Sequence, residues 1–197
     1  MSKYLFILMI LNLTFIPSKL YANINNTIHC SIKPKERTKI SNGIIPLNVP
    51  TIRKKNFSTS EYLSILLKYS LKSLYQVDLA EEKIYSALLK QHSLDHPDRE
   101  SNNISLFTIK KVITGLGYDG LAVYAVNNEN TFQPSEFPEY KQIYLIVDYK
   151  NTYALITDYD AEKIGVYYAT GEYCSVPQKY FPTYFKPIIA IIYRKIK

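Results

Sequence analysis

Apolar and polar residues in the first half of the chain alternate with the period of an α-helix. Between residues 59 and 75, apolar side chains recur three or four positions apart, at Leu63, Leu66, Leu67, Leu71 and Leu74. This spacing predicts an amphipathic helix with one buried face. Ser58 followed by Glu61 predicts a capping box at its start, in which each side chain binds a backbone amide of the first turn.

Two more helices are predicted downstream. The second opens with Asp78 and Glu81 in the same capping relation, and its apolar face comprises Ala80, Ile84, Ala87 and Leu88. A polar loop is expected over residues 91–103. The third helix is predicted to run from Ser105 to Gly117, because its apolar residues keep helical spacing and glycine commonly ends a helix.

From Gly120 onward the chain turns to short runs of β-branched and aromatic residues, which predict strands. The predicted strands span residues 121–126, 143–148, 153–157, 164–168 and 188–193. Turn-like gaps at residues 149–151 and 159–162 join successive strands, so we expect a largely antiparallel sheet. Helices followed by such a sheet indicate an α+β fold.

The N-terminus has the pattern of a secretory signal peptide. Lys3 precedes an apolar core that begins at Leu5, and Ala22 suits a signal peptidase. The core, about a dozen residues, is shorter than the roughly twenty that a membrane-spanning helix needs. We predict a signal peptide at 1–22, a polar lead-in at 23–50 and one domain at 51–197. The protein is expected to be periplasmic or secreted, without a stable membrane anchor.

The charge is mildly basic. The formal net charge of the whole chain is +7. Residues 1–22 contain Lys3, Lys19 and no acidic residue, so their removal leaves +5. The basic runs are typical of solvated surfaces, and no nucleic-acid motif accompanies them, so no nucleic-acid partner is expected.

Cys30 and Cys174 both survive signal cleavage, and a cysteine pair in an oxidising compartment is most often a disulfide. Such a bond would close a loop of nearly the whole domain, worth about 4 to 5 kcal/mol in the chain-entropy model. The alternative is that Cys30 is a catalytic thiol beside His29. Neighbouring residues on an extended segment point to opposite sides, so we favour the disulfide.

Three segments resemble cysteine peptidase family 39, the bacteriocin-processing double-glycine peptidases. Residues 56–69, Asn-Phe-Ser-Thr-Ser-Glu-Tyr-Leu-Ser-Ile-Leu-Leu-Lys-Tyr, resemble the opening of that family's catalytic helix. Residues 103–111, followed by Gly-Leu-Gly-Tyr at 115–118, resemble its Ser-Leu helix, and residues 143–159 resemble its paired strands. The likeness is to standalone periplasmic members, and it implies a papain-like fold.

The resemblance also implies where a catalytic site would lie. In the family a cysteine attacks the peptide carbonyl, a histidine transfers the proton, an aspartate orients the histidine and an upstream glutamine stabilises the oxyanion. Here Ser58 stands at the cysteine position, Thr152 at the histidine position and Tyr168 at the aspartate position, while residues 51–53 contain no glutamine. The resemblance thus implies a degenerate peptidase that binds a peptide or protein partner, as an accessory of a bacterial secretion or surface-assembly system.

Two alternatives remain at this point. The first is an active peptidase with Ser58 or Cys30 as nucleophile, although helix capping already explains Ser58. The second is a zinc site formed by His92 and His96 with Asp95 and Asp98, which would need a helical segment there. Pro97 and the expected loop favour a solvated segment instead. We therefore expect no metal and no cofactor. The sequence pattern does not indicate whether the protein is a monomer or an oligomer.

The chain contains nineteen tyrosines and no tryptophan. In a β-rich region, tyrosine is commonly the large packing residue of a sheet. It also provides wide contact area at binding surfaces. We expect packing for most of them, and binding for a few near the cleft, such as Tyr153 and Tyr168.

Overall fold

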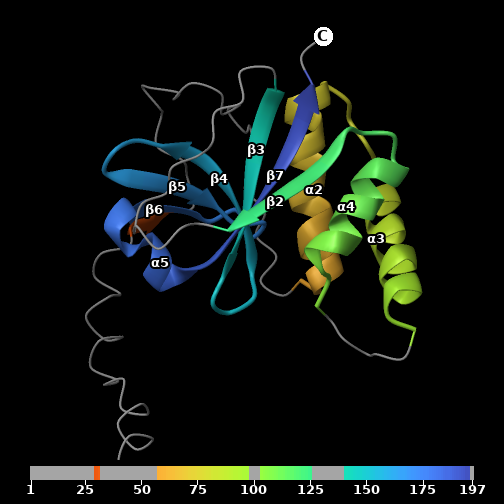
Figure 1. The fold of residues 1–197 in the computed structure, drawn as a ribbon, viewed down its shortest axis with the longest axis horizontal. Coiled ribbons are helices and arrows are strands. Elements are labelled where there is room, and N and C mark those ends of the chain that lie inside the picture. The colour runs from red at the N-terminus through yellow and green to blue at the C-terminus, as the bar shows by residue number, and fades with distance from the viewer. Residues whose placement is uncertain (1–28, 32–56, 98–102, 126–139, 196–197) are drawn as a thin grey trace, which may run out of the picture.

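The computed structural model of the chain describes residues 29–31, 57–97, 103–125 and 140–195. The predicted signal peptide, most of the predicted lead-in and residues 51–53 lie outside the described residues. Three successive helices are followed by the strands of an antiparallel sheet, so the predicted α+β class is confirmed (Figure 1). In the described part of the chain, no helix is both long enough and apolar enough to cross a membrane.

The three predicted helices are present as α2 (Thr59–Tyr75), α3 (Glu81–Asp95) and α4 (Leu106–Gly115). The predicted capping box at the start of α2 is confirmed, since both hydrogen bonds between Ser58 and Glu61 form. The predicted cap of the next helix is wrong. Ala80 is the N-cap of α3 and supplies no side-chain bond, and the Asp78 carboxylate instead accepts a hydrogen bond from Lys72 at 2.8 Å.

The loop predicted from residue 91 is also wrong in its first part, because α3 continues to Asp95. Gln91 Nε2 donates a hydrogen bond to Asp95 Oδ1 across one helical turn, at 2.9 Å. Thr108 and Lys111 of α4 bind the same carboxylate. The bond within α3 and the bonds from α4 stabilise a polar last turn for which apolar periodicity contains no signal.

The described strands form one seven-stranded sheet in which every pairing is antiparallel. Its order is β1-β6-β5-β4-β3-β7-β2. The strands are β1 (His29–Ser31), β2 (Gly120–Ala125), β3 (Tyr140–Asp148), β4 (Tyr153–Tyr159), β5 (Lys163–Tyr167), β6 (Tyr173–Pro177) and β7 (Phe185–Lys195). The five predicted strands are confirmed.

Two strands, β1 and β6, were not predicted. The sequence of β6 includes Ser175 and Pro177, which are poor strand formers, and β1 has only three residues. Proline is accepted where a strand ends near a sheet edge. A 3₁₀ turn (Gln178–Tyr180) and the short helix α5 (Phe181–Tyr184) connect β6 to β7.

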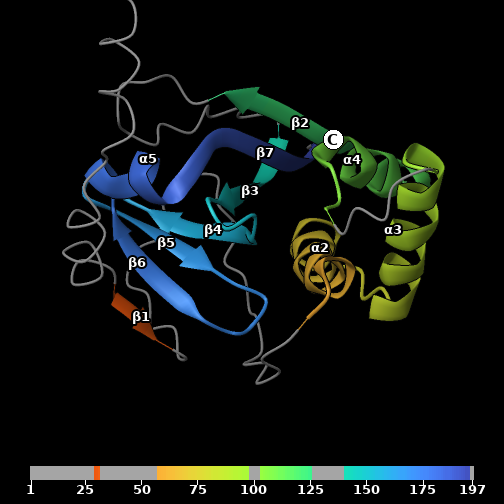
Figure 2. The same cartoon turned by 90° about the horizontal axis from the view of Figure 1, so that it is seen from below.

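Both faces of the sheet are buried. Along β3, Ile143 and Leu145 face the helices, while Tyr144 and Ile146 face the opposite cluster, which includes Phe181. This division follows from the two-residue period of a strand. Helices α2, α3 and α4 lie together on one side of the sheet, with α2 against the strands and α3 packed on α2 and α4 (Figure 2).

The predicted disulfide is confirmed. Cys30 on β1 and Cys174 on β6 are direct register partners, with 4.0 Å between their Cα atoms, and their sulfurs are bonded. The bond joins residues 144 positions apart. It therefore fastens a three-residue edge strand, within the region predicted as a lead-in, to the C-terminal half of the sheet.

Candidate functional site

Two adjoining cavities lie between the N-terminus of α2 and two hairpin turns of the sheet, and together we call them the cleft. The smaller cavity, of about 400 Å³, includes Thr59 in its wall, and the larger, of about 750 Å³, includes Tyr168. Four residues line both cavities: Tyr62, Lys150, Thr152 and Thr170. The cleft is thus assembled from segments that are distant in sequence.

The α2 wall begins at the capping box. The Glu61 amide donates to Ser58 Oγ at 3.2 Å, and the Ser58 amide donates to Glu61 Oε2 at 2.8 Å. These reciprocal bonds satisfy two backbone donors, as a capping box requires. The side chain of Ser58 is therefore engaged in holding the helix end, and the next residue, Thr59, lines the smaller cavity.

The turn between β3 and β4 forms the opposite wall. One oxygen of the Asp148 carboxylate accepts hydrogen bonds from the amides of Lys150 and Thr152, both at 2.8 Å. Asn151 adopts a left-handed conformation with φ 64°, which asparagine tolerates well. Burial raises the pKa of Asp148, and the two amide donors oppose that shift. The carboxylate fixes the turn, so the positions of Lys150 and Thr152 are set by the backbone.

The turn between β5 and β6 closes the cleft. The Gly171 amide donates to the Tyr168 carbonyl at 2.9 Å, and the Tyr168 amide donates to the Glu172 carbonyl at 2.9 Å. Gly171 has φ 87°, a left-handed conformation that glycine adopts without strain. The turn places Thr170 so that its Oγ1 is buried and has no hydrogen-bond partner among the described residues.

Two tyrosine hydroxyls hold the cleft walls together. The Ala169 amide donates to the Tyr62 hydroxyl at 3.0 Å, and the Tyr153 hydroxyl donates to the Ile104 carbonyl at 2.6 Å. Burial raises the pKa of Tyr153 to about 12 and that of Tyr62 further. Both phenols are therefore neutral at physiological pH, as suits groups that hydrogen-bond to the backbone.

Of the three predicted site residues, two line the cleft and the third, Ser58, lies beside it. Thr152 and Tyr168 both line the larger cavity. Ser58 lies at the start of α2, next to Thr59, which lines the smaller one. Burial raises the pKa of the Tyr168 phenol. Among the described residues that line the cleft there is no histidine, and the cysteines there, Cys30 and Cys174, are bonded to each other.

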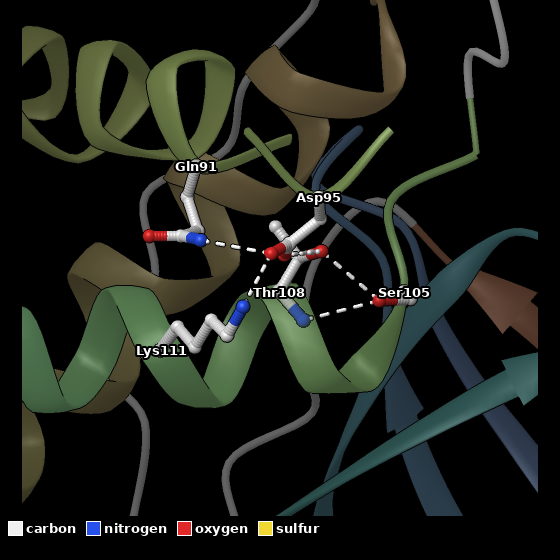
Figure 3. A network of polar contacts seen from close by, with 5 residues as sticks. All are labelled: Gln91, Asp95, Ser105, Thr108 and Lys111. Atoms are coloured by element: carbon white, nitrogen blue, oxygen red, sulfur yellow. Dashed lines mark hydrogen bonds and ion pairs between the residues drawn. The ribbon is translucent and has the colours of Figure 1, made fainter. Parts of the chain in front are cut away.

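The segment weighed as a zinc site has another arrangement. His92 belongs to α3, with its ring centroid 5.2 Å from that of His96. Between them in sequence, the Asp95 carboxylate accepts a hydrogen bond from Thr108 Oγ1 at 2.8 Å and pairs with Lys111 (Figure 3). The Lys111 ammonium is the main cause that lowers the pKa of Asp95 to about 2. Asp95 therefore links α3 to α4.

One set of potential metal ligands lies in the larger cavity. The ligand atoms of Cys30, Glu172 and Cys174 all fall within 4.8 Å of one another. Both sulfurs are joined in the disulfide and lack the thiolate that binds metal. Asp148, Lys150 and Thr170 were not predicted from the sequence as site residues. Asp148 could have been found from the sequence, because it is a carboxylate at the start of a predicted turn.

We found no protein-family model that matches the sequence, and no curated protein that matches it. Among solved structures, the chain is similar to a crystal structure of a double glycine motif protease from an AMS/PCAT transporter in complex with the leader peptide. The TM-score is 0.52 at 14% sequence identity, covering 80% of this chain and 97% of that one. The chain therefore shares the papain-like fold of that protease, as the resemblance implied.

Proposed function

We propose that this protein binds an extended peptide segment in the cleft and does not cleave it. The observation that carries the proposal is the composition of the cleft at the start of α2. Ser58 is engaged as a helix cap, and the described lining residues include neither a histidine nor a free thiol. A serine hydroxyl is a weak nucleophile unless a base within hydrogen-bond reach removes its proton.

The wall of the cleft suits a peptide. Hydroxyl groups at Thr59, Thr152, Thr170 and Tyr168 offer hydrogen bonds to the backbone of a ligand. Val176 and Phe185 add apolar surface in the larger cavity. A mostly apolar pocket with a few polar groups is typical of a binding site. The protease with the similar fold was crystallised with a leader peptide, which supports a peptide as the class of ligand.

The setting that we propose is the bacterial cell envelope. The signal-like N-terminus and the disulfide support export to an oxidising compartment. In this proposal the protein is a degenerate relative of the double-glycine peptidases and serves a secretion or surface-assembly system as a peptide-binding accessory.

Binding and turnover are tested on the same mature protein. Fluorescent peptides are titrated against it by anisotropy, and the same peptides are followed for cleavage by mass spectrometry. We expect saturable binding without products. Thr152→Arg fills the cleft and should abolish binding, whereas Thr114→Arg, a matched change at an exposed position of α4, should preserve it.

The competing function is an active peptidase with Ser58 or Cys30 as nucleophile. Products that appear with the wild-type protein and disappear in Ser58→Ala or Cys30→Ala would establish that function and end the proposal. Absence of binding by every peptide tested would also end it.

A further inference from the structure

The smaller cavity of the cleft has an uneven charge. Lys150 is exposed, lines the cavity and makes no ion pair among the described residues. No carboxylate-bearing residue is among the described residues that line this cavity. The charge of Lys150 also acts on the nearby Asp148 carboxylate, which lines the larger cavity. An ammonium beside a cavity whose described lining contains no carboxylate favours a negatively charged ligand group.

Thr170 provides a second and independent feature. The residue lies in the wall shared by the two cavities, and its hydroxyl oxygen is buried without a hydrogen-bond partner among the described residues. A buried hydroxyl that lacks a partner is costly, and native proteins rarely leave one so without a functional role or a bound water or ion. A hydroxyl donates readily to an anionic oxygen.

The end of α2 adds to the same preference. Thr59 is the first residue of the helix, and the N-terminus of a helix carries a partial positive charge. The Glu61 carboxylate lies in this first turn, but it accepts the hydrogen bond of the Ser58 amide and is not among the residues that line the cavity. Thr59 is thus the residue through which the positive end of the helix borders the smaller cavity.

The larger cavity has a mixed charge, because acidic residues line it as well as Lys150. Its wall contains the carboxylates of Asp148 and Glu172 together with apolar side chains such as Val176 and Phe185. The Asp148 carboxylate already accepts two backbone amides and is fixed in its turn. Lys150 lines both cavities, but of the two described linings only that of the larger cavity also contains carboxylates. An anionic group is therefore favoured more strongly in the smaller cavity, so the cleft distinguishes the two ends of a ligand.

We infer that the smaller cavity binds a carboxylate of the bound peptide, through the Lys150 ammonium and the hydroxyls of Thr59 and Thr170. This inference rests on the proposed function, since it names the chemical group that the cleft selects. The carboxylate is either the C-terminus of the peptide or the side chain of an aspartate or glutamate. Apolar side chains of the same peptide then occupy the larger cavity.

The test uses random nonapeptides tethered through their N-termini. Matched sets end in a free carboxylate or a carboxamide, and each set is made with or without aspartate and glutamate. Loss of a charge-assisted hydrogen bond weakens binding by about tenfold or more. We expect peptides that contain a carboxylate to bind at least about tenfold more tightly than the fully neutral set. The matched sets distinguish a terminal carboxylate from a side-chain carboxylate.

Variants connect this preference to the cavity. Lys150→Gln and Thr170→Val should each reduce the preference for carboxylate peptides, whereas Lys163→Gln, an exposed change on β5, should preserve it. Equal binding of charged and neutral peptides would overturn the inference and leave peptide binding intact. A preference that persists in both cleft variants would also overturn it. No binding by any set would overturn the proposed function, and this inference with it.

Discussion

The amide of Ala169, in the turn between β5 and β6, donates a hydrogen bond of 3.0 Å to the hydroxyl of Tyr62 on α2. The two residues are 107 positions apart in sequence. Ala169 is fully buried and Tyr62 is half-buried, so bulk water does not easily replace this bond at the amide. The contact holds the helix that begins at Ser58 against the turn that carries Tyr168 and thereby sets the width of the cleft.

We expect Tyr62→Phe to lower the free energy of unfolding by about 1 kcal/mol, because it leaves the Ala169 amide without its acceptor. It should also weaken peptide binding, since the two walls are no longer joined. Urea unfolding followed by circular dichroism measures the first effect. Tyr85→Phe on α3 is the matched control, because no hydrogen bond of its hydroxyl is present among the described residues. Equal stability of the two variants would show that the bond contributes nothing.

This contact also shows what the sequence could and could not predict. The position of α2 follows from leucines at helical spacing and from the Ser58 and Glu61 pair, which act within one turn. The bond to Ala169 depends on the arrangement of the whole sheet, and no local pattern encodes it. The same holds for the last turn of α3, where Asp95 depends on partners in α4.

The site was predictable to a similar extent. The resemblance placed Thr152 and Tyr168 in one site, and they do line one cavity. Lys150 and Thr170 were not identified, because a lysine and a threonine in turns are common on any surface. The Thr170 hydroxyl is significant because it is buried without a described hydrogen-bond partner, and Lys150 because it lines the same cavity without a described ion pair. These properties exist only in the folded chain.

A second prediction concerns Ser58 as a helix cap. Ser58→Ala should lower the free energy of unfolding by about 1 kcal/mol, whereas Ser58→Asn should remain within a few tenths of the wild type, because asparagine is an equally good N-cap. Urea unfolding of the three proteins provides the comparison. If Ser58→Asn were as unstable as Ser58→Ala, the cap would not explain the residue.

A third prediction follows from the low pKa of Asp95. A carboxyl whose folded-state pKa of about 2 lies below the ordinary value near 4 stabilises the fold above that ordinary value. The contribution is lost as pH falls from about 4 towards 2. Asp95→Asn should therefore destabilise the protein at pH 7, and the difference from wild type should shrink over that acidic range.

Asp78→Asn is the matched control for Asp95→Asn. Asp78 also pairs with a lysine, but its side chain is 61% exposed, compared with 8% for Asp95. Exposed ion pairs contribute little because water and salt screen them. Thermal unfolding at several pH values should therefore show a larger loss for Asp95→Asn. A difference from wild type that does not change between pH 4 and pH 2 would contradict the assignment.

A fourth prediction concerns the disulfide between Cys30 and Cys174. Closing so long a loop restricts the unfolded chain, so the Cys30→Ser, Cys174→Ser double variant should lose up to about 5 kcal/mol of unfolding free energy. The amides of β6 should also exchange faster with solvent, because β1 then pairs with it through three residues alone. Hydrogen exchange measures this change. A reductant added to the double variant is the control and should have no further effect.

A fifth prediction separates stability from binding at Thr170. Thr170→Val keeps the shape of the side chain and removes a buried hydroxyl that has no partner among the described residues. Removal of such a group relieves its desolvation penalty, so we expect the unfolding free energy to stay the same or rise by about 1 kcal/mol. Affinity for carboxylate peptides should fall in the same variant. Functional sites commonly sacrifice stability in this way. Calorimetric unfolding of the free protein, beside anisotropy titrations, tests both changes together, and a variant that loses stability would mean that the hydroxyl has a structural partner.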